Sequence, residues 1–216
     1  MPDTERPDIE RNVTTVEVFA DITCPFTHVG LKRIVQLVDE TTEPVDVLVR
    51  AWPLEWINGA PMDPVAVQAK AKALCQQLDV DDFNGFRADR WPDSTVAALN
   101  LAASAYERDA ATGLAVSLAV RTALFEKGLD ISDPAILAEI AEVFDLPTPI
   151  EEPSAAVQAD YAEGKDRGVT GSPHFWIDEH HDFFCPSLDL GRDHAGDLTA
   201  QFDTYGLEQF LAHLGQ

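Results

Sequence analysis

The chain has 216 residues, enough for one large domain or two small ones and for a substantial hydrophobic core. It carries 38 acidic and 15 basic residues, and the resulting formal charge of −23 argues against nucleic-acid backbones and anionic membrane surfaces as partners. No segment is long and apolar enough to span a membrane. The polar stretch 1–12 lacks a signal-peptide pattern and is expected to form a flexible lead-in. Three cysteines without such a signal predict reduced thiols and a cytoplasmic location.

The first two predicted elements meet at a cysteine. Apolar side chains at alternate positions predict a buried strand over residues 16–20, and helical spacing predicts a helix that ends near Val38. Pro25 suits the first helical position, because its missing N–H leaves no hydrogen bond unmade there. Cys24 therefore lies at a helix N-terminus, where unpaired N–H groups stabilise a thiolate. We favour this nucleophilic role over simple core packing.

The motif Cys24-Pro25-Phe26-Thr27 has one thiol where a dithiol Cys-x-x-Cys motif has two. Thr27 cannot close an internal disulfide with Cys24. Because residues three apart share a helix face, the Thr27 hydroxyl is expected to donate a hydrogen bond to the Cys24 thiolate. His28 could donate a proton, but we favour a solvent-facing position for it in the first turn.

After this helix, alternating valines predict a second strand over residues 44–52, parallel to the first because a helix connects them. A turn-rich loop with two tryptophans is expected at 53–59. The following hundred residues have helical periodicity, with Cys75 packing inward as a small hydrophobic side chain. Helices are predicted to start near Asp63, Ser94, Thr112, Asp133 and Ser154.

A strand pattern returns behind a glycine-bracketed loop, residues 168–173. An apolar strand follows the loop, then a turn and an antiparallel return strand that begins at residues 183–184. A last helix is expected to be capped by Thr204. Pro173, directly before the strand, is a candidate cis-proline, although the local sequence alone favours an ordinary trans bond.

Together, the Cys24–Thr27 motif, the helical insertion and the 168–173 loop resemble the DsbA-like family of the thioredoxin superfamily. This branch includes 2-hydroxychromene-2-carboxylate isomerases and kappa-class glutathione transferases. The resemblance covers residues 14–214, nearly the whole chain. It implies an α/β thioredoxin fold, with a central mixed sheet flanked by helices, formed by residues 14–60 and 168–216. An α-helical domain, 61–167, is inserted between these two parts.

The resemblance also implies roles for particular residues. Cys24 is the nucleophile, Pro173 is cis and faces it, and the backbone of Ser172 pairs with bound substrate. The role of the resolving cysteine does not transfer, because Thr27 occupies its place. The substrate-binding or thiol-binding positions are Pro25, Phe26, His28, Thr170 and Ser172.

These roles predict a thiol–disulfide oxidoreductase with a monothiol mechanism. A small thiol such as glutathione or mycothiol would resolve the mixed disulfide, and no tightly bound cofactor is expected. The substrate would be a small-molecule thiol or a protein disulfide, and the enzyme a monomer or homodimer. The alternatives are an isomerase or transferase that holds a thiol cofactor, or a redox-inactive binding protein. Phe26 and the Trp52–Trp56 region could line an apolar groove, although such aromatic residues more often belong to the core.

The remaining cysteine and the histidines give two weaker hypotheses. Cys185 could act as a distant resolving thiol if its Cα lies within about 7 Å of that of Cys24, but a strand-end thiol without a redox role is favoured. His174, His180 and His181 lie near Cys185 in the sequence. No metal is predicted there, because adjacent histidines point apart and a second Cys-x-x-Cys is absent.

Overall fold

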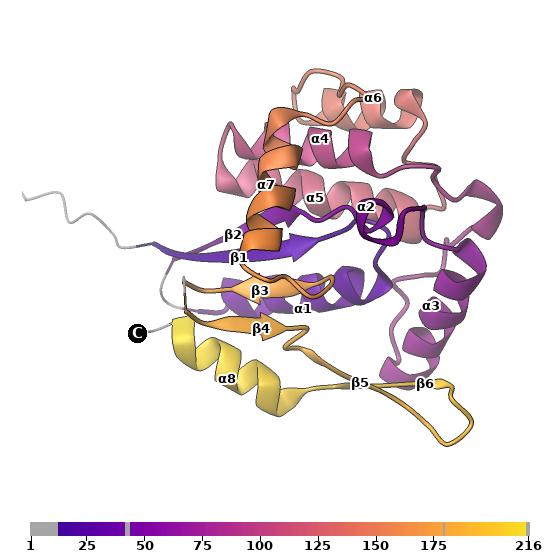
Figure 1. The fold of residues 1–216 in the computed structure, drawn as a ribbon, viewed down its shortest axis with the longest axis vertical. Coiled ribbons are helices and arrows are strands. Elements are labelled where there is room, and N and C mark those ends of the chain that lie inside the picture. The colour runs from indigo at the N-terminus through magenta and orange to yellow at the C-terminus, as the bar shows by residue number, and fades with distance from the viewer. Residues whose placement is uncertain (1–12, 42–43, 179, 215–216) are drawn as a thin grey trace, which may run out of the picture.

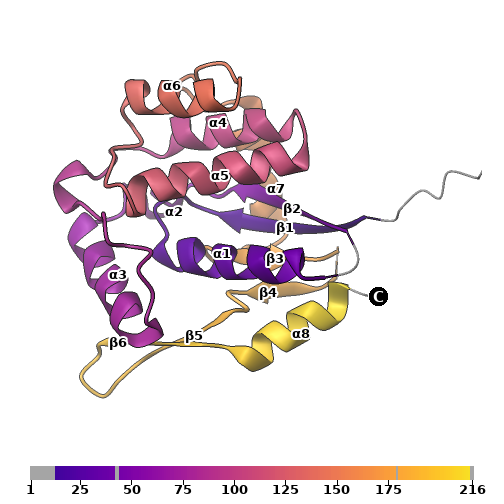
Figure 2. The same ribbon diagram turned by 180° about the vertical axis from the view of Figure 1, so that it is seen from behind.

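The computed structural model describes residues 13–41, 44–178 and 180–214, so the predicted lead-in over 1–12 lies outside the described residues. Figures 1 and 2 show the arrangement from opposite sides. The strands are β1 (Thr14–Ala20), β2 (Val45–Ala51), β3 (His174–Trp176), β4 (Asp182–Phe184), β5 (Leu188–Arg192) and β6 (Leu198–Phe202). The helices are α1 (Pro25–Asp39), α2 (Leu54–Asn58), α3 (Pro64–Leu78), α4 (Val96–Tyr106), α5 (Ala110–Phe125), α6 (Pro134–Val143), α7 (Ala155–Asp166) and α8 (Thr204–Leu214), with a 3-10 turn η1 (Ala88–Arg90).

Four strands form a mixed sheet in the order β2-β1-β3-β4. β1 and β2 are parallel, with Val18 opposite Val49, which confirms the predicted βαβ unit. On its other side β1 pairs antiparallel with β3, with Val18 opposite Phe175. β3 pairs antiparallel with β4, so the predicted hairpin lies beside the strand that leads to Cys24. β1 is therefore central, and both of its edges are paired.

The alternation along β1 divides the core into two layers. Val16 and Val18 belong to a cluster that includes buried side chains of α1 and α8. Phe19 points to the other face, where it packs with Trp52 and Trp176. Figure 1 shows α7 crossing one face of the sheet, and Figure 2 shows α1 across the opposite face. The sheet is therefore covered on both sides, as near-continuous apolar strands require.

Residues 64–166 contain α3 to α7, between the second and third strands of the sheet. Asp63, Asp133 and Ser154 accept hydrogen bonds from the first turns of α3, α6 and α7, so these predicted starts are confirmed. The start near Thr112 is wrong by two residues. Asp109 caps α5 instead and accepts from the N–H of Thr112 at 2.7 Å.

Three other expectations need correction. The loop predicted at 53–59 contains the short helix α2, which ends at Gly59 in the left-handed conformation (φ 71°). A second hairpin, β5–β6, was not predicted and lies apart from the main sheet. Thr204 is the first residue of α8, and the side chain of Asp203 accepts from the N–H of Gly206 at 2.8 Å. Among the described residues, no helix combines the length and apolar character of a membrane span.

Candidate active site

Cys24 lies between the end of β1 and the start of α1. Its backbone is extended (φ −79°, ψ 113°), its carbonyl accepts the N–H of His28 at 3.2 Å, and Pro25 follows as the first helical residue. The side chain is buried, with 4% of its surface exposed. Its Sγ donates to the carbonyl oxygen of Ser172 at 3.0 Å. The thiol is thus at the N-terminus of α1 and faces the loop that precedes β3.

The 168–173 loop reaches Cys24 because β3 pairs with β1. The peptide bond between Ser172 and Pro173 is cis. Pro173 packs against α1 at Gly30, where an added Cβ would lie 4.0 Å from the proline Cγ. The structure therefore brings together three of the predicted site residues, Cys24, Ser172 and Pro173, from segments about 150 positions apart in the sequence.

Thr27 does not bond to Cys24, so the predicted hydrogen bond is wrong. Its Oγ1 lies 2.8 Å from the Oγ of Ser172, which also accepts the N–H of Asp21 at 2.9 Å. The Thr27 side chain has no exposed surface, and the Ser172 hydroxyl is its hydrogen-bond partner. Thr27 therefore holds the proline loop against α1.

Asp21, directly after β1, is a buried carboxyl that the sequence patterns did not single out. It has no exposed surface, and its carboxylate accepts from the N–H of Thr23 (2.7 Å), the N–H of Leu54 (2.9 Å) and the hydroxyl of Thr95 (3.2 Å). Burial raises the pKa of Asp21, and the hydrogen bonds and the charge of Arg121 only partly oppose this effect. This carboxyl organises the loop that carries Cys24.

Arg121, also missed, projects from α5 and is fully buried. Nη2 donates to the carbonyl of Asp21 at 3.2 Å, and Nη1 donates to the carbonyl of Ser117 at 3.0 Å and to its hydroxyl at 2.5 Å. Its Nε has no partner among the described residues. Burial lowers the pKa of Arg121 to about 10, against the opposing charges of Asp21, Tyr106 and Cys24. Arg121 therefore holds the carbonyl of Asp21, three residues before Cys24; its one sequence signal is an arginine within an apolar helix.

His28 is buried rather than solvent-facing, which corrects the prediction. Its ring stacks on Phe125 with centroids 5.0 Å apart and meets the edge of Phe83 at 5.5 Å. Burial lowers the pKa of His28 to about 4, and the charge of Lys32 contributes further. The helical segment covers this side of α1, which the sequence of α1 alone could not indicate. The side chain of His28 therefore contacts Phe83 and Phe125, while its backbone N–H bonds to the carbonyl of Cys24.

One group of potential metal ligands comes together within the described residues. Nitrogen and carboxylate atoms of His28, Asp82 and Glu126 all lie within 4.8 Å of one another. Lys32 pairs with both carboxylates, and its Nζ is 3.1 Å from Glu126 Oε1. Its ammonium group already supplies the positive charge that these carboxylates need.

The histidines near Cys185 do not converge on one point. His174 is buried, its Nε2 lies 2.8 Å from Asp182 Oδ2, and its Nδ1 accepts the N–H of the exposed Thr170 at 3.3 Å. His181 pairs with Asp178 on the surface. His174 thus fixes the proline loop to β4, and Thr170 takes part through its backbone.

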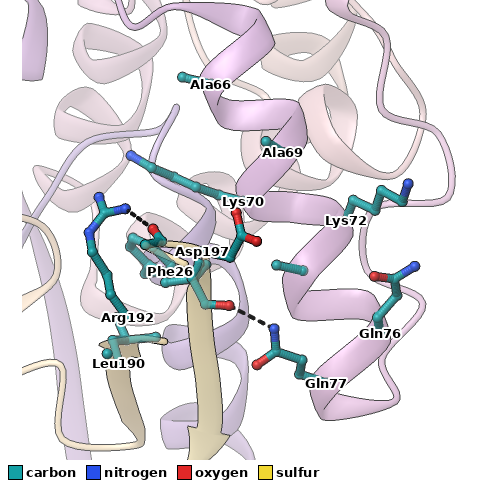
Figure 3. Close-up of a pocket in the computed structure, with 14 residues that line it drawn as sticks. Phe26, Ala66, Ala69, Lys70, Lys72, Gln76, Gln77, Leu190, Arg192 and Asp197 are labelled. Atoms are coloured by element: carbon teal, nitrogen blue, oxygen red, sulfur yellow. Dashed lines mark hydrogen bonds between the residues drawn. The ribbon is translucent and has the colours of Figure 1, made fainter. Parts of the chain in front are cut away.

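A groove of about 910 Å³ runs between α3 and the β5–β6 hairpin and reaches Phe26 (Figure 3). Lys70 extends from α3, with its Nζ 5.8 Å from the centre of the Phe26 ring. Arg192 lines the opposite wall and donates to the carbonyl of Gly196 at 2.7 Å. Cys24 lies two residues from Phe26 but does not itself line the groove.

Of Phe26, Trp52 and Trp56, which the sequence suggested as the lining of an apolar groove, only Phe26 lines the groove beside α3. Trp52 is 3% exposed and packs in the core beneath α7. Trp56 meets the edge of Tyr161, with centroids 5.0 Å apart. The core alternative is therefore correct for Trp52.

All three cysteines are free thiols. Cys185 is buried in the turn after β4, and its N–H donates to the carbonyl of Pro173 at 3.2 Å. Cys75 is only half-buried on α3, beside Phe83 and Phe86, so it packs inward less than predicted. Of these two, only Cys185 reaches the proline loop.

A mixed sheet built on a βαβ unit, a cysteine at the first helix N-terminus and a proline loop facing it define a thioredoxin-fold protein. The chain belongs to the DSBA-like thioredoxin domain family, whose family model matches residues 15–193. This finding confirms the predicted family and fold.

Similar solved structures agree on the fold. A probable DsbA oxidoreductase from Streptomyces coelicolor has 24% sequence identity and a TM-score of 0.59, over 79% of this chain and 82% of its own. A 2-hydroxychromene-2-carboxylate isomerase has 14% identity and a TM-score of 0.59, over 93% and 95%. The cytosolic disulfide reductase DsbM from Pseudomonas aeruginosa has 17% identity and a TM-score of 0.55, over 92% and 97%. No curated protein matches the chain.

Proposed function

We propose that the protein is a thiol–disulfide oxidoreductase that uses Cys24 as its nucleophile and a small thiol as its resolving partner. The observation that carries the proposal is the position of Cys24 Sγ, at the N-terminus of α1 and 3.0 Å from the carbonyl of Ser172. The unpaired N–H groups of the first turn favour negative charge on this sulfur. The thiolate is the reactive form in disulfide exchange.

The cycle has two exchange steps. In the first, the Cys24 thiolate attacks one sulfur of a substrate disulfide, forms a mixed disulfide and releases the other half as a thiolate. In the second, a small thiolate attacks the substrate sulfur of that mixed disulfide. Cys24 leaves as a thiolate, and the substrate now carries the small thiol. A second small thiol reduces that product, so two small thiols supply the two electrons.

Nearby residues have separate parts in this proposal. The N–H of Ser172 has no acceptor within the described parts of the chain, so it can pair with the substrate backbone beside the reacting sulfur. Thr27 holds that loop in place through the Ser172 hydroxyl. Lys70 and Arg192 bring positive charge to the groove at Phe26, in a chain whose net charge is −23. A small thiol with carboxylates, such as glutathione, suits this groove better than an uncharged one.

The relatives support this choice without deciding it. DsbM is described as a cytosolic disulfide reductase, and one of its structures was determined with GSH. A reducing cycle depends on a pool of reduced small thiol, and for that reason we propose a cytoplasmic location. Mycothiol could replace glutathione, because it would react by the same exchange.

A second candidate is an isomerase or transferase that holds a thiol cofactor in the same place. The likeness to 2-hydroxychromene-2-carboxylate isomerase and the single thiol of the motif favour it. In that case Cys24 would bind the cofactor sulfur without forming a disulfide with it.

The test is reduction of a small-molecule disulfide by glutathione, with mass spectrometry of the protein at each stage. The wild type and Cys75→Ser should show turnover, and Cys24→Ser should show none. Rapid alkylation of Cys24 below neutral pH should accompany the activity. Turnover that survives Cys24→Ser, or a Cys24 that never forms an adduct with a disulfide, would refute the proposal.

A further inference from the structure

Two cysteines contact the proline loop, one after β1 and the other after β4. Cys24 Sγ donates to the carbonyl of Ser172 at 3.0 Å, and the N–H of Cys185 donates to the carbonyl of Pro173 at 3.2 Å. The Cys24 thiol and the Cys185 backbone are therefore attached to successive residues of one loop. Both are buried, with 4% of each residue exposed.

The turn that carries Cys185 packs directly on α1. At Gly30, an added Cβ would lie 3.1 Å from the Oγ of Ser187 and 3.9 Å from Cδ1 of Leu188. The Ser187 hydroxyl also donates to the carbonyl of Gly30 at 3.5 Å. No side chain separates the turn from the helix at this point. Cys185, two residues before Ser187, is thus held beside the first two turns of α1.

The backbone of Cys185 is unusual. Its φ is 51°, in the left-handed region, and the other non-glycine residues with positive φ among those described are Asp79 and Asp145. Aspartate tolerates this conformation through local hydrogen bonds, and glycine has no Cβ to oppose it. Cysteine has neither advantage. An outlier of this kind beside a reactive group is a reason to look for a function.

The charge state of Cys24 affects the pKa of the Cys185 thiol. Burial raises the pKa of the Cys185 thiol, and the negative charge of Cys24 raises it further. A thiolate at Cys24 therefore disfavours a second thiolate at Cys185. Once Cys24 has formed a mixed disulfide its charge is gone, which removes the smaller of the two causes that raise the pKa of Cys185.

We propose that Cys185 is an internal resolving thiol for Cys24, which replaces the second cysteine that the motif lacks at Thr27. This inference rests on Cys24 as the nucleophile of the proposed function, and it replaces the second exchange step proposed there. The Cys185 thiolate attacks Cys24 Sγ of the mixed disulfide, the bond to the substrate sulfur breaks, and a Cys24–Cys185 disulfide forms. The released substrate thiolate takes up the proton that Cys185 has lost. The substrate disulfide is reduced by two electrons, the two cysteines are oxidised, and two small thiols later reduce them again.

Under this proposal the small thiol acts after the substrate has left. It would then regenerate the enzyme and would not be needed to release the substrate. A single turnover should therefore proceed without any added thiol. Cys75 provides the matched control, because it is a third thiol, half-buried on α3 and outside the site.

The experiment uses the fully reduced full-length chain with one equivalent of glutathione disulfide and no free thiol. After acid quenching, intact-mass and peptide analysis would follow the wild type, Cys185→Ser, Cys185→Gly and Cys75→Ser. Glycine suits the left-handed backbone, so Cys185→Gly tests the loss of the thiol even if Cys185→Ser folds poorly. The wild type and Cys75→Ser should yield the cross-linked Cys24–Cys185 peptide and two equivalents of glutathione.

Both Cys185 variants should instead accumulate glutathione on Cys24, at least ten times more than the wild type. Equal accumulation of that adduct in all four proteins would overturn the role of Cys185 and leave the proposed function intact. If no protein forms an adduct or a cross-link, the nucleophilic role of Cys24 fails, and the inference fails with it.

Discussion

Replacing Ser172 with alanine removes a hydroxyl that serves two buried partners. Its Oγ accepts the N–H of Asp21 at 2.9 Å and lies 2.8 Å from Thr27 Oγ1, and both of these residues have no exposed surface. A buried polar group left without a partner costs about 1–3 kcal/mol. The Thr27 hydroxyl can rotate toward a backbone carbonyl of its own helix, but the Asp21 N–H is fixed. We therefore expect Ser172→Ala to lower the free energy of unfolding by about 2–3 kcal/mol.

The matched variant is Thr27→Val, which keeps the branched shape and removes one hydroxyl. Ser172 then still accepts the Asp21 N–H, so we expect a loss of only about 1 kcal/mol. In the double variant the two losses should not add, because both changes remove the same hydroxyl pair. The coupling energy should be about 1 kcal/mol.

Urea unfolding followed by tryptophan fluorescence measures all four proteins. The reasoning is refuted if Ser172→Ala costs no more than Thr27→Val, or if the two effects add completely. Adduct formation at Cys24, measured on the folded variants, should slow in Ser172→Ala, because the proline loop loses its bond to α1.

Three further outcomes can be measured. His28 has a pKa of about 4 in the folded protein, below its ordinary value of 6.5, so the folded state binds fewer protons than the unfolded state between these pH values. Stability should therefore fall by up to about 3 kcal/mol as the pH drops from 6.5 to 4, and His28→Phe should flatten this slope in urea titrations at each pH. Lys70→Glu should raise the KM for glutathione about threefold to tenfold at low salt. Lys72 also lines the groove but extends away from Phe26 (Figure 3), so Lys72→Glu should have a smaller effect. An equal effect of both variants would argue against specific recognition near Phe26. Thr27→Cys should close a disulfide with Cys24 on oxidation, seen as the loss of two thiols in mass spectrometry; an unchanged thiol count would show that the helix start is too rigid to bridge.

The local parts of the site follow from the sequence because short-range physics specifies them. Alternating apolar residues formed β1, the proline at the first helical position began α1, and Cys24 lies between them as predicted. The sequence also predicted the N-caps of α3, α6 and α7, because an aspartate or serine side chain accepts hydrogen bonds from the free N–H groups of a first helical turn.

Predictions from the sequence were wrong where a distant segment of the chain supplied the contact of a side chain. The sequence pairs the Thr27 hydroxyl with Cys24, because these two residues belong to one four-residue motif. In the structure the hydroxyl bonds to Ser172 instead. His28 was expected in solvent because nothing in α1 reveals that α5 covers it. The β5–β6 hairpin, which forms one wall of the groove, is polar and short and gave no clear strand pattern.

The sequence by itself determined that a cysteine would begin the first helix after a buried strand, because that depends on neighbouring residues and on the conformational limits of proline. Only the tertiary structure decided what surrounds the thiol. The pairing of β3 with β1 brings Ser172 to Cys24, α5 delivers Arg121 to the carbonyl of Asp21, and the turn after β4 brings Cys185 to the proline loop. The first two of these contacts join positions a hundred or more residues apart, and burial of the apolar faces of the sheet and helices, not local preference, holds them together.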